Sequence, residues 1–159
     1  TMNPEEGELR PQLLDRFGLC VEISGERDVG LRKAIVERVL LFEMDDDRFH
    51  AKWDAEDLAL RGRLSAARVA LPVVDVPDEI LESAVAVVAE LGVAGHRGDI
   101  TVLKAAKALA AIKGVPSPDP ECLSDAFRLA LPHRLKEDPF EEMATGRKRL
   151  EGVLARFGA

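Results

Sequence analysis

Acidic and histidine side chains are the first places to look for metal chemistry in this sequence. Asp45, Asp46 and Asp47 stand in a row, but a calcium loop needs alternating ligands and a glycine. A solvated helix end is the better interpretation of these three carboxylates. The histidines are scattered, without a second ligand at zinc-binding spacing. The serines lack the strand–turn–helix context of a nucleophile. The sequence therefore predicts neither a metal site nor a serine nucleophile.

The densest polar motif opens the sequence, in the letters TMNPEEGELRPQLLDRFG. The Asn-Pro pair at residues 3–4 starts a turn, an acidic stretch ends at Gly7, and a short helix is expected from Leu9 to Phe17. Pro11 suits the first turn of that helix, where its missing N–H costs little. By residue type alone, Arg16 is a cation that complements the dipole at the helix end. A natural N-terminus is usually loose and polar, so we expect the sequence to begin inside a fold.

Helices are expected to dominate the rest of the chain. Residues 19–24, LCVEIS, alternate as a strand does, but no partner strand follows them. Asp28 and Asp99 are candidate N-caps, and Gly114 is a candidate helix stop. Asp45–Asp47 are expected to end a helix, because carboxylates at a C-terminus oppose the dipole. The hydrophobic spacing predicts helices over 28–44, 54–70, 78–91, 100–113, 121–131 and 147–157.

Composition limits the classes of protein to consider. The 159 residues have room for one domain, or for one domain and part of another. Hydrophobic residues make up 47% but aromatic residues only 4%, so Ala, Val and Leu must do most of the packing, which suits helices. A formal net charge of −7 argues against a nucleic-acid surface. No run is long enough to span a membrane. The two cysteines, Cys20 and Cys122, indicate buried free thiols in a reducing compartment.

Four stretches, taken in order, closely resemble one family of AAA+ ring ATPases, the ATPase motor subunits of magnesium chelatase. They are NPEEGELRPQLLDRFGLCVEI, RDVGLRKAIVERVLLFE, GHRGDITVLKAAKALAAIKG and LALPHRLKEDPFEE. The resemblance implies a mainly α fold: a helical bundle, the AAA+ lid with a helical insertion, preceded by a short remnant of the α/β core. It implies that residues 1–27 are that remnant, 28–76 the insertion and linker helices, and 77–159 the lid.

The resemblance also assigns roles to individual residues. Asn3 takes the sensor 1 position, where an amide orients the attacking water, and Arg16 takes the position of the arginine finger for a neighbouring subunit's ATP. Arg97, in HRGD, matches sensor 2, which contacts the phosphates of its own or a neighbouring subunit. Asp15 would help to hold the subunit interface, and Arg10 is a second interface candidate.

The family's phosphate-binding loop, G-x-x-x-x-G-K-[ST], is absent from this sequence, and so is the acidic Walker B segment. We expect both upstream of sensor 1, together with the strands that residues 19–24 would join. The simplest interpretation is a truncated chain that does not hydrolyse ATP by itself. The implied cofactors, ATP and Mg²⁺, would be held with that missing half and with neighbouring subunits.

The function implied by the resemblance is that of a motor's sensor and lid portion, coupling ATP hydrolysis to insertion of Mg²⁺ into protoporphyrin IX. The implied partners are a homo-oligomeric ring, a hexamer, and the other chelatase subunits, in the cytoplasm or the plastid stroma. Neither nucleic acid nor a membrane is expected as a partner. A cobalt-chelatase AAA+ subunit is one alternative, because metal choice lies in other subunits. A non-catalytic helical module that docks on a AAA+ ring through its Asp15/Arg16 surface is another.

Overall fold

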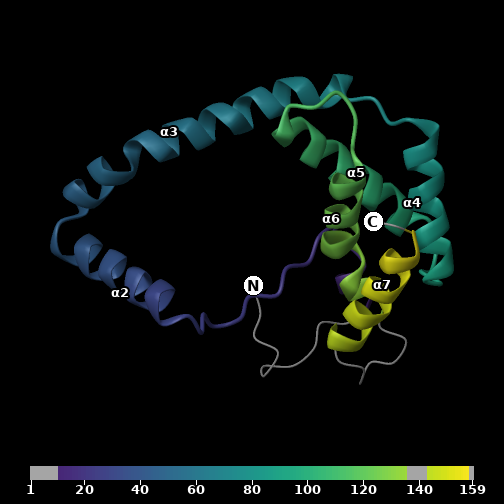
Figure 1. Cartoon of the computed structure of the whole chain (residues 1–159), viewed down its shortest axis with the longest axis horizontal. Helices are drawn as coiled ribbons and strands as arrows, with labels where there is room; N and C mark the ends of the chain where they lie inside the picture. The colour runs from purple at the N-terminus through teal and green to yellow at the C-terminus, as the bar shows by residue number, and fades with distance from the viewer. Residues whose placement is uncertain (1–10, 136–142, 158–159) are drawn as a thin grey trace. The chain divides into compact units, whose positions relative to one another are not determined.

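A computed structural model describes residues 11–135 and 143–157 of the chain. No strand is present in these two ranges, and most of their residues are helical (Figure 1). The prediction of a mainly α fold is therefore confirmed. The elements are α1 (Pro11–Leu14), α2 (Val29–Met44), α3 (Asp46–Ala70), the 3-10 turn η2 (Leu71–Val73), α4 (Asp78–Glu90), α5 (Arg97–Lys113), α6 (Pro120–Ala130), the 3-10 turn η3 (Pro132–Arg134) and α7 (Met143–Phe157).

The chain divides into two compact units. The first, called the lid unit here, consists of Thr1–Val21 with Ala67–Ala159, and the second of Glu22–Ala66. The sequence predicted three parts, a core remnant, an insertion and a lid, with boundaries near residues 27 and 76. This division stays a prediction. No helix in the described part of the chain combines the length and the apolar composition needed to cross a bilayer.

Local capping explains several helix ends. The Asp28 side chain accepts a hydrogen bond from the backbone N–H of Leu31 at 2.8 Å, which starts α2 as predicted. The Asp119 carboxylate accepts from the N–H of Cys122 at 2.6 Å, and Pro120 occupies the first position of α6. Gly114 ends α5 with φ of 72°, a conformation that glycine adopts without steric cost.

Two expected helix boundaries are wrong. The three aspartates at 45–47 end α2, but α3 begins at once at Asp46, eight residues before the expected start. The Asp45 carboxylate accepts from the N–H of Arg48 at 2.9 Å, because an acidic side chain stabilises a helix N-terminus as well as opposing a C-terminus. Asp99 was expected to be an N-cap, but α5 begins at Arg97, so Asp99 lies inside its first turn.

The expected strand at residues 19–24 does not form. A strand needs a neighbour to pair its backbone groups, and the described residues contain none. One backbone bond ties this segment to the lid unit, from the N–H of Cys20 to the carbonyl of Leu129 in α6, at 2.8 Å. The preceding helix, expected from Leu9 to Phe17, is described as the short α1, followed by turn bonds to Arg16 and Phe17.

The core of the lid unit lies among α4, α5, α6 and α7, with α5 packed along α6 (Figure 1). Alanines on α5 allow this close approach, and a second small cluster extends to η2 and the end of α3. Phe127 of α6 is the largest fully buried side chain, at 1% exposure. The main cluster also holds Ala84, Val87, Val88, Leu91, Val102, Ala105, Ala106, Leu123, Ala126, Ala130, Leu131, Leu135, Leu150, Val153 and Leu154.

The second unit has a different character, because none of the residues of α2 is buried. Aromatic side chains gather around the α2–α3 junction: the rings of Phe42 and Phe49 meet edge to face, 5.5 Å between centroids. The Arg38 guanidinium lies 4.8 Å from the centre of the Trp53 ring. Trp53 lies inside α3 and thus contacts the neighbouring helix α2.

Candidate functional site

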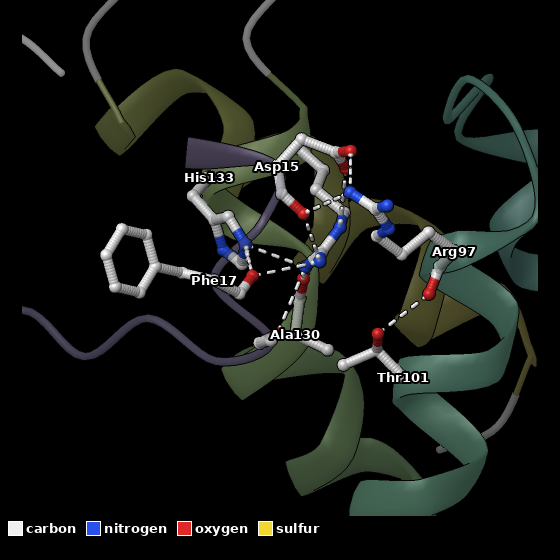
Figure 2. Close-up of polar contacts among 8 residues, drawn as sticks. Asp15, Phe17, Arg97, Thr101, Ala130 and His133 are labelled. Carbon is white, nitrogen blue, oxygen red and sulfur yellow. Dashed lines mark hydrogen bonds and ion pairs between the residues drawn. The ribbon is translucent and has the colours of Figure 1, made fainter. Parts of the chain in front are cut away.

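The site is an ionic cluster that joins the segment after α1 to the start of α5. Arg97, the first residue of α5, donates from Nη1 to the Asp15 carboxylate at 2.6 Å and to the Asp15 carbonyl at 3.2 Å (Figure 2). Both side chains are about half exposed, so this ion pair contributes about 0–1 kcal/mol to stability. The ion pair matters because it connects two segments of the chain, at residues that lie 82 positions apart in the sequence.

The first turn of α5 is held close to α4 by the residue after Arg97. Gly98 is buried, and a Cβ there would lie 3.1 Å from the Cγ1 of Val93 and 3.7 Å from the Cδ2 of Leu131. A larger side chain would need these neighbours to move. Gly98 therefore fixes where the Arg97 side chain leaves the helix.

Arg134, the last residue of η3, lies at the centre of the cluster. Its side chain is only 4% exposed, and its Nε lies 3.6 Å from the Asp15 carboxylate. Its Nη2 donates to the carbonyls of Asp15 at 3.3 Å and Phe17 at 3.0 Å, and its Nη1 donates to Gly18 at 3.1 Å and to Ala130. Burial lowers the pKa of Arg134, while Asp15 opposes that shift. A buried cation needs such partners, because removing it from water costs on the order of several kcal/mol.

His133 is buried beside Arg134, at 4% exposure. Its Nε2 lies 3.0 Å from the carbonyl of Phe17 and 2.7 Å from Nη1 of Arg134 (Figure 2). Nδ1 is buried and has no hydrogen-bond partner among the described residues. A second proton would place a buried charge next to the Arg134 guanidinium. Burial, and then Arg134, accordingly lower the pKa of His133 below its ordinary value of 6.5.

The depressed pKa of His133 predicts an acid-dependent loss of stability. The unfolded chain binds more protons than the folded chain below pH of about 6.5, so the stabilisation from neutral His133 is present above that pH and is lost as pH falls. We expect the free energy of unfolding of the parent chain to fall, relative to that of His133→Gln, between pH 7.5 and roughly pH 5. The Gln amide can still donate to Phe17. Urea titrations at several pH values measure the difference, and parallel pH profiles would contradict the assignment.

Arg16 lies between the residues that the cluster holds, but its own side chain is exposed. No hydrogen bond or ion pair joins its guanidinium to any residue in the described ranges; only its backbone N–H bonds, to the carbonyl of Leu13 at 3.0 Å. Asp15 on one side is bound by Arg97, and Phe17 on the other is bound by Arg134 and His133. The guanidinium is therefore presented outward from a fixed backbone.

The structure brings some of the predicted site residues together. Asp15, Arg16 and Arg97 lie at one place in the lid unit, whereas Asn3 and Arg10 lie outside the described residues. Asp15 was expected at a subunit interface, and the contacts described for it are within the chain. The roles of all five residues stay predictions.

Sequence similarity to known proteins identifies the family of this chain. The AAA lid domain family matches residues 81–153. The magnesium-chelatase 38 kDa subunit of Cereibacter sphaeroides is 47% identical over 140 residues, 88% of this chain and 42% of that protein. The chain belongs to the magnesium-chelatase ATPase family. A magnesium-chelatase subunit ChlI homolog of Methanocaldococcus jannaschii is 43% identical over 157 residues, 99% of this chain and 43% of that protein. The chloroplastic subunit ChlI of Nicotiana tabacum is 42% identical over 144 residues, 91% of this chain and 34% of that protein.

The chain spans less than half the length of these relatives. Arg97 binds the Asp15 carboxylate at 2.6 Å, and a guanidinium binds phosphate oxygens by the same kind of charge-assisted bond; Arg16 is exposed. The 159 residues do not contain the phosphate-binding loop, whose backbone N–H groups and lysine would bind the phosphates. No cluster of metal-ligating side chains occurs within residues 11–135 and 143–157. We therefore derive no chemical step on a nucleotide from this chain alone.

Sequence reasoning missed the two residues at the centre of the cluster. It included His133 and Arg134 in a stretch typical of this family but gave neither a role beyond excluding a zinc site. The available signal was their context, since a His-Arg pair follows LALP and precedes Leu135 within an apolar run. A basic pair in such a setting is buried only when it is paired. The partner, 116–119 residues away, cannot be read from the local sequence.

Proposed function

We propose that the chain is the sensor and lid portion of a AAA+ motor subunit of magnesium chelatase. In this role it helps a ring of ATPase subunits, a hexamer, to couple ATP hydrolysis to insertion of Mg²⁺ into protoporphyrin IX by partner subunits. The cytoplasm, or the plastid stroma, is the place proposed for it. When bound, ATP would supply the driving reaction, and Mg²⁺ is the cargo.

One observation carries the proposal. Arg97 and Arg134 bind the residue before Arg16 and the residue after it, while the Arg16 guanidinium remains exposed. A finger that acts on a neighbouring subunit's phosphates must be directed outward from a rigid support, since its contribution depends on position. In this arrangement Arg97 would face the phosphates of a nucleotide from the lid, and Arg16 would reach across a ring interface.

A chimaera tests this function. The chain replaces the matching part of the Cereibacter sphaeroides 38 kDa subunit, which retains its own remaining sequence. We expect the chimaera to hydrolyse ATP at a rate within about tenfold of the parent subunit, because the two are 47% identical over the exchanged part. A variant of the subunit without that part is the control. A chimaera that assembles and binds ATP but turns over no faster than the control would overturn the proposal.

The non-catalytic docking module is a second candidate, and the exposed apolar surface of α2 favours it, in place of the Asp15/Arg16 surface expected from the sequence. Most large apolar side chains of α2, among them Ile35, Val39 and Phe42, are 48–85% exposed in the described structure, whereas Leu41 is partly buried. Patches of this kind mark interaction sites. To test this, the 159-residue chain is added as a separate protein to an intact ATPase of the family. A docking module would change the rate of ATP turnover by that ring. Turnover that is unchanged by the added chain argues against this candidate.

A further inference from the structure

Arg134 donates most of its hydrogen bonds to one short segment. Three of the four carbonyl groups that it binds belong to Asp15, Phe17 and Gly18, and the fourth belongs to Ala130. Carbonyl acceptors fix the path of the backbone, whatever the side chains are. The residue inside this bound stretch is Arg16.

The neighbours of Arg134 act on the same segment. His133 contacts the Phe17 carbonyl at 3.0 Å, and the Leu129 carbonyl accepts from the N–H of Cys20 at 2.8 Å. The Arg97–Asp15 pair is half exposed and therefore weak. Of the polar contacts described between this segment and the rest of the lid unit, the two Arg97 bonds to Asp15, the His133 contact and the Cys20 bond would remain without the Arg134 side chain.

We propose that Arg134 is a positioning residue, which fixes the backbone on both sides of Arg16 to the lid so that the lid and the finger move as one piece. This inference rests on the proposed function, in which Arg16 acts on a nucleotide. Arg134 itself touches no nucleotide in this scheme. Its effect on ATP turnover passes through the position of Arg16.

Arg134→Lys is the informative variant. Lysine keeps the positive charge, but it is a single ammonium group on a flexible stem and does not reproduce the planar fork that reaches three carbonyls. The matched control is Arg128→Lys. Arg128 binds Glu151 through two bonds, at 2.8 and 3.1 Å, and joins α6 to α7 without contacting residues 15–18. A purely structural role would give both variants the same behaviour.

The first measurement uses the 159-residue chain. Hydrogen exchange, followed by NMR, reports the protection of the Cys20 and Phe17 amides, which bond to Leu129 and Leu14. We expect Arg134→Lys to lower this protection by about tenfold or more, because hydrogen bonds from a charged donor are lost. The amide of Leu131, which bonds to Phe127 inside the lid, should keep its protection. Arg128→Lys should leave the Cys20 and Phe17 amides unchanged. Unchanged protection in Arg134→Lys would overturn the inference.

The second measurement uses the chimaera. We expect Arg134→Lys to lower kcat by about 100-fold with nucleotide affinity retained, since a small misplacement of a reacting group can cost that much. In an Arg16→Ala background the same substitution should have little further effect, because a residue that acts through Arg16 is not additive with it. If Arg16→Ala lowers kcat and Arg134→Lys does not, the positioning role is wrong. If Arg16→Ala has no effect, the proposed function is wrong, and the exchange measurement still decides whether Arg134 holds the segment.

Discussion

Arg16→Ala is expected to lower ATP turnover by the chimaera about 10³-fold or more while leaving nucleotide binding largely intact. The expected size is that of an arginine that stabilises charge in the phosphoryl-transfer transition state. Binding should survive because the proposed finger belongs to a neighbouring subunit, and the nucleotide is held mainly by other groups. Steady-state turnover and equilibrium binding of a fluorescent ATP analogue measure the two quantities separately.

Arg63→Ala serves as the control for Arg16→Ala. Arg63 is an exposed arginine of α3, so its loss removes the same charge without touching the cluster around Asp15. We expect near-parental turnover from this variant. Lost binding with little loss of turnover per bound ATP, in Arg16→Ala, would remove the assignment of the finger.

Phe127→Ala is expected to destabilise the lid unit by about 3–5 kcal/mol, the usual cost of emptying a phenylalanine site in a core. Phe127 is 1% exposed and packs within the cluster formed by α4, α5, α6 and α7. A loss of that size is a large part of the stability of an ordinary domain. Urea unfolding of the 159-residue chain, followed through methyl NMR signals of the core valines and leucines, measures it.

Ile100→Ala is the matched control for the core substitution. Ile100 also lies on a helix of the lid unit, but it is 53% exposed. Its replacement should change the free energy of unfolding by about 0.5 kcal/mol or less. Equal losses in the two variants would mean that the core does not lie around Phe127.

Local sequence was a good guide to the start of α2 and the end of α5. Asp28 caps α2, and Gly114 ends α5, as their types predict. Local rules failed where two of them compete. The aspartates at 45–47 oppose the end of α2 and equally favour the start of α3, and the structure uses both effects within two residues.

The candidate site was predictable only in part. The resemblance to the family drew attention to Arg16, Arg97 and Asp15, and the structure places these three in one cluster. It did not indicate that Asp15 is shared between Arg97 and Arg134. A buried cation is recognised from its acceptors, and the acceptors of Arg134 are mostly backbone carbonyls, which every residue type carries.

The sequence by itself determined the helical class, the N-cap of α2, the glycine that ends α5, the absence of a phosphate-binding loop, and the family. These follow from residue types and spacings within a few turns of chain. Only the tertiary structure decided that Arg134 binds the backbone on both sides of Arg16 and that the N–H of Cys20 bonds to Leu129. The physical reason is distance along the chain: these contacts join segments more than 100 residues apart, and the packing of α5 and α6 brings them together.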